Sequence, residues 1–322
     1  RQPRVITLVL DRSGSMDGRP IDLERAAVRA IARSLRAGDV VSAVTWNTER
    51  DVPLEGHVVT GPSDPRLLAL ADSLRADGGT DLNAGLRFGY EIASRLYDAS
   101  RLNRVVVISD GIANAGITEV DIIDDAAEDA ERDGIYLVGV GVGAGFNDTM
   151  MDAITDAGRG AYVFLDSPAE ADAVFGERWA ETMEVGLLAV RVELTLPWYM
   201  ALTEFHGEEV STVAERVRPQ HLAPGDAMVF HQVIEACEPS LVEDGDSIAV
   251  RATYTRPSGR IAAEDGTETT FGALLSSAHP HLDRGDVIVE YAEGLRLGAR
   301  ARDGVSGRDR LERALALADT VD

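Results

Sequence analysis

The chain of 322 residues has one cysteine, no lysine and few aromatic side chains, which make up 5% of it. A single cysteine, Cys237, cannot form an internal disulfide, so no disulfide framework holds the fold. Cys237 follows an apolar run and lacks positive surroundings, which predicts a small buried side chain rather than a reactive thiol. No stretch of 18 apolar residues occurs, so the sequence predicts no insertion into a membrane.

Basic charge is also scarce. The chain carries 55 acidic and 31 basic residues, all of the latter arginine, for a formal net charge of −24. Nucleic acids and anionic membranes both need basic surface to neutralise phosphates, so the balance argues against either as a partner. No signal peptide is visible, which slightly favours the cytoplasm, although the chain begins at Arg1 and a leader could precede it.

The first part of the chain alternates apolar strands with helical patterns. Buried strands are expected at 5–10, 40–46, 105–109, 135–142 and 161–164, with an edge strand at 52–59. Helical patterns are expected at 22–35, 65–74, 82–97, 120–132, 149–157 and 168–185. This alternation predicts an α/β domain with a doubly wound, mostly parallel sheet.

After Gly186 the pattern changes to short segments of period two at 188–196, 228–236 and 247–255, separated by turn signals. These segments predict a small antiparallel β-sandwich, and two amphipathic helices are expected at 287–300 and 308–318. The predicted organisation is therefore an α/β domain over 1–185, a sandwich over 186–275 and a helical segment over 276–322. In the last helix, Leu311, Leu315 and Ala318 share one face, which we expect to be packed.

Five side-chain oxygens stand where strands end or helices begin. Asp11, Ser13 and Ser15 follow the first strand, Asp110 follows the strand 105–109, and Thr80 opens a helical pattern. The carboxyl ends of strands in such sheets are where ligands bind. Two carboxylates and three hydroxyls are hard ligands that suit Mg²⁺, Mn²⁺ or Ca²⁺ rather than zinc. Taken singly, each segment is explained as well by a turn or a helix cap.

The three segments together resemble the metal-ion-dependent adhesion site of von Willebrand factor type A domains. The pattern Asp-x-Ser-x-Ser, then Gly-Gly-Thr-Asp, then Ser-Asp-Gly matches at 11–15, 78–81 and 109–111. The resemblance implies that Asp11, Ser13, Ser15, Thr80 and Asp110 surround a divalent cation, and that a partner's carboxylate completes the shell. The whole arrangement resembles a bacterial branch with a trailing β-sandwich and helical tail. The inter-α-trypsin-inhibitor heavy chains are more distant relatives.

These observations favour a divalent-metal-dependent protein-binding module, with Mg²⁺ bridging to an Asp or Glu of a partner protein. A metal-assisted hydrolase is the rival interpretation, since the same cation can activate water. No His, Lys or Glu in the three loops is an obvious general base, so no enzymatic activity is expected. A structural ion that stiffens the top of the sheet is the third alternative.

Other conspicuous residues have plainer explanations. His279 and His281 flank Pro280 in an expected loop and lack the further ligands that a metal site needs. Trp198 and Tyr199 are expected to be buried where the two domains join, because aromatic side chains are usually buried.

Overall fold

The computed structural model describes residues 2–47, 50–79, 82–111, 135–143, 160–207, 209–257, 261–300 and 305–321, together with Met151, Thr155 and Gly158. The strands are β1 Arg4–Asp11, β2 Val40–Trp46, β3 Arg50–Val58, β4 Leu102–Ser109, β5 Tyr136–Val142, β6 Tyr162–Leu165, β7 Leu187–Thr195, β8 Met200–His206, β9 Gln220–Leu222, β10 His231–Ala236, β11 Ser247–Arg256 and β12 Ile261–Thr270. The helices are α1 Arg19–Ser34, α2 Pro65–Ser73, α3 Leu82–Arg95, α6 Pro168–Asp172, α7 Trp179–Met183, α8 Phe271–Ser276, α9 Pro280–Arg300 and α10 Val305–Ala318.

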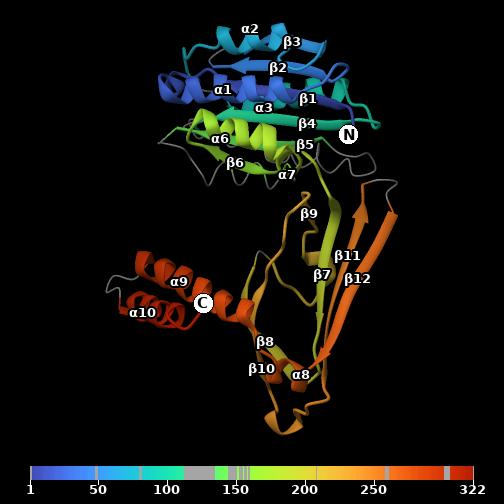
Figure 1. The fold of residues 1–322 in the computed structure, drawn as a ribbon, viewed down its shortest axis with the longest axis vertical. Coiled ribbons are helices and arrows are strands. Elements are labelled where there is room, and N and C mark those ends of the chain that lie inside the picture. Colours follow the sequence, from blue (N-terminus) through green and yellow to red (C-terminus); the bar gives the residue numbers. More distant parts are fainter. Residues whose placement is uncertain are drawn as a thin grey trace. The chain divides into compact units, whose positions relative to one another are not determined.

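Six strands form the central sheet in the order β3-β2-β1-β4-β5-β6 (Figure 1). Every neighbouring pair is parallel except β2 and β3, which confirms the prediction of a mostly parallel α/β sheet. β3 is the expected edge strand, and the structure adds that it runs antiparallel to β2. From β1 the chain continues outward to β2 and β3 on one side of the sheet, and from β4 it continues outward to β5 and β6 on the other side. The strand order therefore reverses between β1 and β4, and the loops that leave these two strands flank the crevice where such sheets bind ligands.

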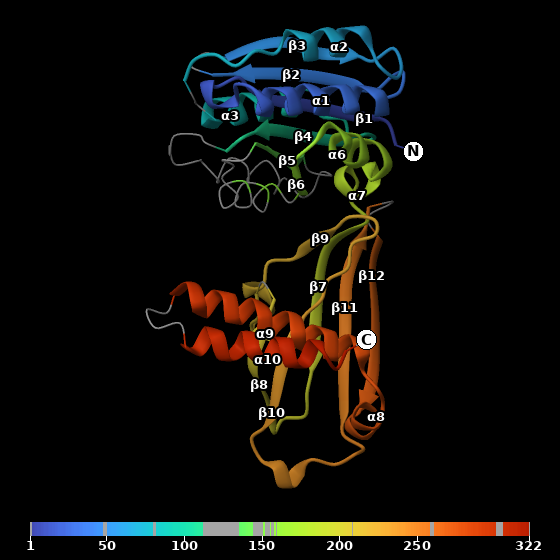
Figure 2. The ribbon, with the colours of Figure 1, turned by 60° about the vertical axis from the view of Figure 1, so that its left-hand side comes forward.

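The strands are apolar along their length because both faces of the sheet are covered. One core packs the sheet residues Leu8, Leu10 and Val106 against α1, α2 and the segment from α6 to α7. The other packs Val9 and Val107 against α3. Figures 1 and 2 show α1 and α3 on opposite faces of the sheet. Because helices cover both faces of the sheet, the ends of β1 and β4 are held in place.

Three of the helices expected in this part of the chain either lie outside the described residues or differ in the structure. The helices expected at 120–132 and 149–157 lie almost wholly outside the described residues. The single helix expected at 168–185 is divided into α6, a π-helical turn at Ala173–Glu177 and α7. The division places the apolar side chains of Val174, Phe175 and Trp179 in the core. The free energy gained by burying them exceeds the cost of interrupting the regular helix.

Residue contacts divide the chain into two compact units: the first runs to Leu188 and includes His221–Asp226, and the second holds most of the remainder. Beyond the central sheet, the described residues form two separate antiparallel sheets, β10-β8 and β12-β11-β7-β9. The strand expected at 228–236 begins only at His231, and β8 and β12 were not predicted. β12 carries four acidic or glycine residues in its middle, a composition that argues against a strand, but it pairs along its whole length with β11.

The two C-terminal helices pack against each other as a hairpin (Figure 2). α9 begins at Pro280, so His281 lies in its first turn rather than in a loop. Of the expected packing face of the last helix, Leu311 is half-buried and lies against Gly294 of α9, but Leu315 is 67% exposed and Ala318 is also exposed. Gly307 and Ala314 are the buried residues in the described part of α10. The two helices meet closely at glycines, because a Cβ on Gly307 would lie 2.5 Å from the backbone nitrogen of Gly298.

Two further expectations are corrected. Trp198 is 85% exposed, whereas its neighbour Tyr199 is buried and donates its hydroxyl to Asp246. Cys237 is exposed, because it lies just past the end of β10 rather than inside the strand. No helix among the described residues is long and apolar enough to cross a membrane.

The close approach of α3 to β1 generates a stability prediction. A Cβ on Gly89 would lie 2.4 Å from Cγ2 of Val9, whereas a Cβ on Gly298 in α9 meets nothing within 4 Å. Alanine favours a helix over glycine by about 1 kcal/mol, but overpacking a core costs about 1–3 kcal/mol. We therefore expect G89A to lower the free energy of unfolding and the matched variant G298A to raise it, as measured by urea denaturation. Stabilisation by both would contradict the packing of α3 on β1.

Candidate metal centre

Asp11 is the last residue of β1 and is fully buried. Parallel pairing sets the ends of β1 and β4 side by side, with Leu10 opposite Ile108. The hydroxyl of Ser109, the last residue of β4, consequently donates to Oδ2 of Asp11 at 2.6 Å. The backbone N–H of Ser13 donates to Oδ1 of Asp11 at 2.8 Å. An ionised carboxylate has about four lone-pair positions, so both oxygens can still face a cation.

The loop after β1 turns back on itself through a short 3-10 helix at Gly14–Met16. This turn brings the hydroxyl oxygens of Ser13 and Ser15 within 3.0 Å of each other. Ser13 is buried and Ser15 is exposed, so the group opens to solvent on the side of Ser15. Gly14 permits the turn, because a Cβ at this position would lie 3.2 Å from the carbonyl oxygen of Gly78.

Asp110 follows β4 directly and is 1% exposed. Its negative charge acts on the carboxyl of Asp11 and contributes to the raised pKa of that group. The structure therefore brings together the ends of the two predicted segments, with Asp11, Ser13 and Ser15 on one loop and Asp110 on the adjacent one.

Thr80, the fifth predicted ligand, lies outside the described residues. The segment just before it is attached to the first loop by two backbone hydrogen bonds. The N–H of Asp77 donates to the carbonyl of Arg12 at 2.7 Å, and the N–H of Gly14 donates to that of Gly78 at 3.1 Å. The chain therefore enters position 80 from beside the loop that carries Ser13 and Ser15.

Glu24 was not identified from the sequence. It lies on α1 with no exposed surface, and its Oε1 accepts the backbone N–H of Asp11 at 2.9 Å. Burial and the charge of Asp11 hold the pKa of Glu24 well above its usual range. The sequence does contain a signal, because Glu24 stands on the apolar stripe formed by Ile21, Ala27 and Val28, where an acidic residue is unusual.

Burial raises the pKa of Asp11 to about 6. Hydrogen bonds from Ser109 and Ser13 partly offset this effect, while the charge of Asp110 adds to it. A buried carboxylate beside a second one is electrostatically costly, and a divalent cation would relieve that cost.

The donor set fits a hard cation. Neighbouring ligands of an octahedral Mg²⁺, each about 2.1 Å from the ion, lie about 3 Å apart. The 3.0 Å between the hydroxyl oxygens of Ser13 and Ser15 matches this separation. No three His, Cys, Asp or Glu side chains form a metal-binding group in the described part of the chain.

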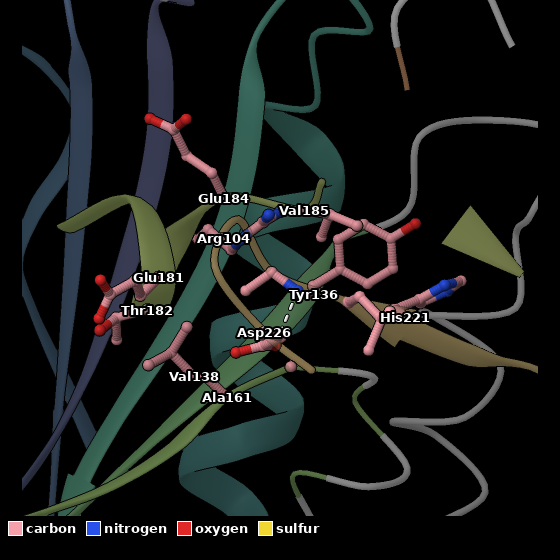
Figure 3. A pocket seen from close by; sticks show the side chains of 13 residues that line it. Arg104, Tyr136, Val138, Ala161, Glu181, Thr182, Glu184, Val185, His221 and Asp226 are labelled. Carbon is pink, nitrogen blue, oxygen red and sulfur yellow. Dashed lines mark hydrogen bonds between the residues drawn. The ribbon is translucent and has the colours of Figure 1, made fainter. Parts of the chain in front are cut away.

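A cavity of about 70 Å³ lies at the opposite, amino-terminal end of the strands and is lined by Arg104 and Tyr136 (Figure 3). The guanidinium of Arg104 lies 4.9 Å from the centroid of the Tyr136 ring, and burial lowers the pKa of Arg104 to about 10. The cavity has room for only a few water molecules. The cavity borders the buried positive charge of Arg104. Its lining includes none of the residues Asp11, Ser13, Ser15 and Asp110, which we call the oxygen cluster.

A doubly wound sheet with acidic and hydroxyl side chains on the loops at its switch point defines a class of α/β domain that binds ligands at that edge. The model of the von Willebrand factor type A domain matches residues 6–176, more than half of the chain. The chain therefore belongs to this family.

Curated relatives share the family but differ in length. The chain is 23% identical over 302 residues to the uncharacterized protein YfbK of Escherichia coli, covering 92% of this chain and 52% of that protein. It is 25% identical over 197 residues to the uncharacterized protein sll0103 of Synechocystis, covering 61% and 46%. It is 25% identical over 243 residues to the human inter-alpha-trypsin inhibitor heavy chain H1, covering 72% and 26%. The chain thus spans about half the length of the first two relatives, or less.

Solved structures extend the likeness in fold. A von Willebrand factor type A protein from Catenulispora acidiphila has a TM-score of 0.65 at 19% identity, covering 99% of this chain and 80% of that one. The ArnB paralog VWA2 from Sulfolobus acidocaldarius has a TM-score of 0.51 at 12% identity, covering 100% and 81%. Both likenesses reach well beyond the matched domain, into the antiparallel sheets and the C-terminal helices.

The raised pKa of Asp11 predicts how D11N changes stability: the variant should be more stable than the parent chain without metal, and should lack the gain in stability that Mg²⁺ gives the parent. The pKa of Asp11 in the folded chain, about 6, exceeds the ordinary value of 3.8 for an aspartate, so its ionisation opposes folding as the pH rises through this interval. In EDTA at pH 8, D11N should therefore be more stable than the parent chain, by about 1–3 kcal/mol. In Mg²⁺ the parent should gain about 2.7 kcal/mol at a hundredfold excess over the dissociation constant, and D11N should gain nothing.

Thermal melts at pH 5 and pH 8, with EDTA or Mg²⁺, measure both effects. D17N is the matched control, because Asp17 is an exposed acidic residue of the same loop. Stabilisation of D11N by Mg²⁺ as large as that of the parent would overturn the assignment of Asp11 as a ligand.

Proposed function

We propose that the chain is a divalent-metal-dependent protein-binding module in which the cation bridges to an Asp or Glu of a partner protein. The observation that carries the proposal is that two buried carboxylates and an exposed hydroxyl group lie at the same edge of the central sheet. Asp11 and Asp110 are buried, whereas Ser15 is exposed. The carboxylates would hold the ion, and its open side would face a partner.

The proposed ligands are Asp11, Ser13, Ser15, Thr80 and Asp110, with Mg²⁺ as the cation; Mn²⁺ and Ca²⁺ have the same preference for oxygen. Five protein oxygens leave one position of an octahedral shell for an outside ligand. Three of the five are neutral hydroxyls, which leaves the ion more positive toward an incoming carboxylate. Membership of the von Willebrand factor type A family supports the same assignment.

Hydrolysis is the less favoured function, because the described residues offer no accessible base beside the ion. Glu24 is a further carboxyl in contact with Asp11, but it has no exposed surface and its Oε1 accepts the N–H of Asp11. General-base catalysis requires a group within hydrogen-bond reach of the substrate or its water. A purely structural ion would need no exposed ligand, yet Ser15 is exposed.

Binding of acidic peptides tests the proposal. We expect a peptide library rich in Asp and Glu to yield ligands whose affinity requires Mg²⁺ and falls at least about tenfold in D110A, because that variant removes one of the two charges that hold the ion. D17N, in the same loop, should bind as the parent does. Fluorescence anisotropy with and without EDTA measures each affinity.

The alternatives make different predictions in the same samples. Metal-dependent cleavage of phosphoesters or peptides that D110A abolishes would establish a hydrolase. Stabilisation by Mg²⁺ with no carboxylate ligand in the library would establish a structural ion. Peptide binding that survives both EDTA and D110A would contradict a bridging cation.

A further inference from the structure

A second group of chemically active side chains lies in the second unit, apart from the oxygen cluster. It lines a cavity of about 460 Å³ formed by β8, β10 and the α9–α10 hairpin. The cavity is lined in part by His206, His231, Glu204, Asp286 and Glu290. None of these residues belongs to the loops of the candidate metal centre.

The two histidines are held side by side by strand register. β8 and β10 are antiparallel, and His206 lies directly opposite His231. Their ring centroids are 5.7 Å apart. Two imidazoles that bind one tetrahedral Zn²⁺ through nitrogens about 2 Å from the ion have centroids roughly 5 Å apart. The backbone therefore already sets the rings near the spacing that a shared ion requires.

Each ring has one buried nitrogen that makes no hydrogen bond among the described residues, Nδ1 of His231 and Nε2 of His206. The other nitrogen of His231, Nε2, is hydrogen-bonded to Oδ1 of Asp286 at 2.6 Å. His206 lies between two carboxylates at longer range, with Nδ1 3.9 Å from Oε1 of Glu293 and Nε2 3.7 Å from Oε2 of Glu204. His231 therefore has the pattern of a metal-binding histidine, in which a hydrogen-bonded carboxylate fixes the tautomer and leaves the other nitrogen to bind.

A third ligand stands beside the first two. Glu204 lies two residues before His206 on β8, so both side chains project from the same face of the strand. Oε2 of Glu204 is 3.7 Å from Nε2 of His206. Adjacent ligands of a tetrahedral zinc ion are separated by about 3.3 Å. No group of three ligands is preformed among the described side chains. Glu204 is 53% exposed, however, so a rotation of its side chain can complete one.

The surrounding charges allow a cation here. Arg310 and Arg313 line the cavity, but both lie within 4 Å of Glu290, and Arg296 pairs with Glu293. Glu204 and Asp286 add two carboxylates beside the histidines, which are neutral when they bind a metal. Nitrogen and carboxylate ligands in this combination select zinc and its neighbours over Mg²⁺.

We infer that His206, His231 and Glu204 form a second metal site that takes Zn²⁺, with Asp286 orienting the ring of His231. Three protein ligands leave a fourth position open toward the cavity, where water or a small oxygen ligand can bind. The ion would also join the two strands of an otherwise isolated pair, a sheet too small to be stable alone. Because Asp286 belongs to α9, occupancy would tie the helical hairpin to this sheet.

Titration with Co²⁺ tests the site in the intact chain kept in excess Mg²⁺. Tetrahedral Co²⁺ absorbs strongly in the visible range, whereas octahedral Co²⁺ absorbs weakly, so the spectrum separates this site from an oxygen site. We expect one tetrahedral Co²⁺ per chain, displaced by Zn²⁺, in the parent and equally in D110A. H206A and H231A should abolish the absorption, and H281A, which changes an exposed histidine of α9, should leave it intact.

D286N separates a ligating role from an orienting one. Loss of an orienting carboxylate usually weakens metal binding 10–100-fold, so D286N should keep one site per chain with affinity reduced in that range. Should H206A or H231A fold poorly, NMR of the parent with Co²⁺ gives the same answer, because only bound imidazoles show strongly shifted N–H signals. Two such signals are expected. Absorption that is only octahedral, or that D110A abolishes, would overturn the second site.

Discussion

Two carboxylates buried at adjacent strand ends are the constraint on which the account of this molecule depends. Asp11 ends β1 and Asp110 directly follows β4, both in the interior, where charge is poorly solvated. Neutral donors from Ser13 and Ser109 compensate Asp11 only in part, and its pKa remains raised to about 6. A buried carboxyl group whose charged form opposes folding is best explained by a ligand that binds the charged form. The proposed divalent cation would convert the repulsion between the two carboxylates into attraction, and would make the stability of this edge depend on metal.

The rest of the first unit serves to hold these groups in place. The reversal of strand order between β1 and β4 brings the two loops together, and cores on both sheet faces keep the strand ends from shifting. α1 supplies Glu24, which accepts the N–H of Asp11 and keeps the end of β1 fixed. The hydrogen bonds from Asp77 and Gly14 attach the segment before position 80 to the same loop. The second unit carries the separate group of side chains around His206 and His231.

The sheet could be predicted because strands covered on both faces are continuously apolar. The positions of Asp11 and Asp110 at neighbouring strand ends could be predicted because these residues follow those strands; their role as ligands stays a prediction. Glu24 was missed because its role arises from contact with Asp11, not from the loop pattern. β12 was missed because a run of acidic and glycine residues is a poor strand former until β11 provides a partner. Trp198 was expected to be buried and is exposed, since composition does not determine which of two neighbouring aromatics faces the core. The pairing of His206 with His231 depends on strand register, which the sequence pattern does not specify.

The most direct test of the central claim is a crystal of the chain soaked in Mn²⁺, with the ion located by its anomalous scattering. The account predicts one strong peak at the carboxyl ends of β1 and β4, about 2 Å from the hydroxyl oxygens of Ser13 and Ser15. The side chain of Asp110 should face the ion directly or through water. An anomalous map with no peak between these two loops, at a Mn²⁺ concentration that saturates the melting shift, would contradict it.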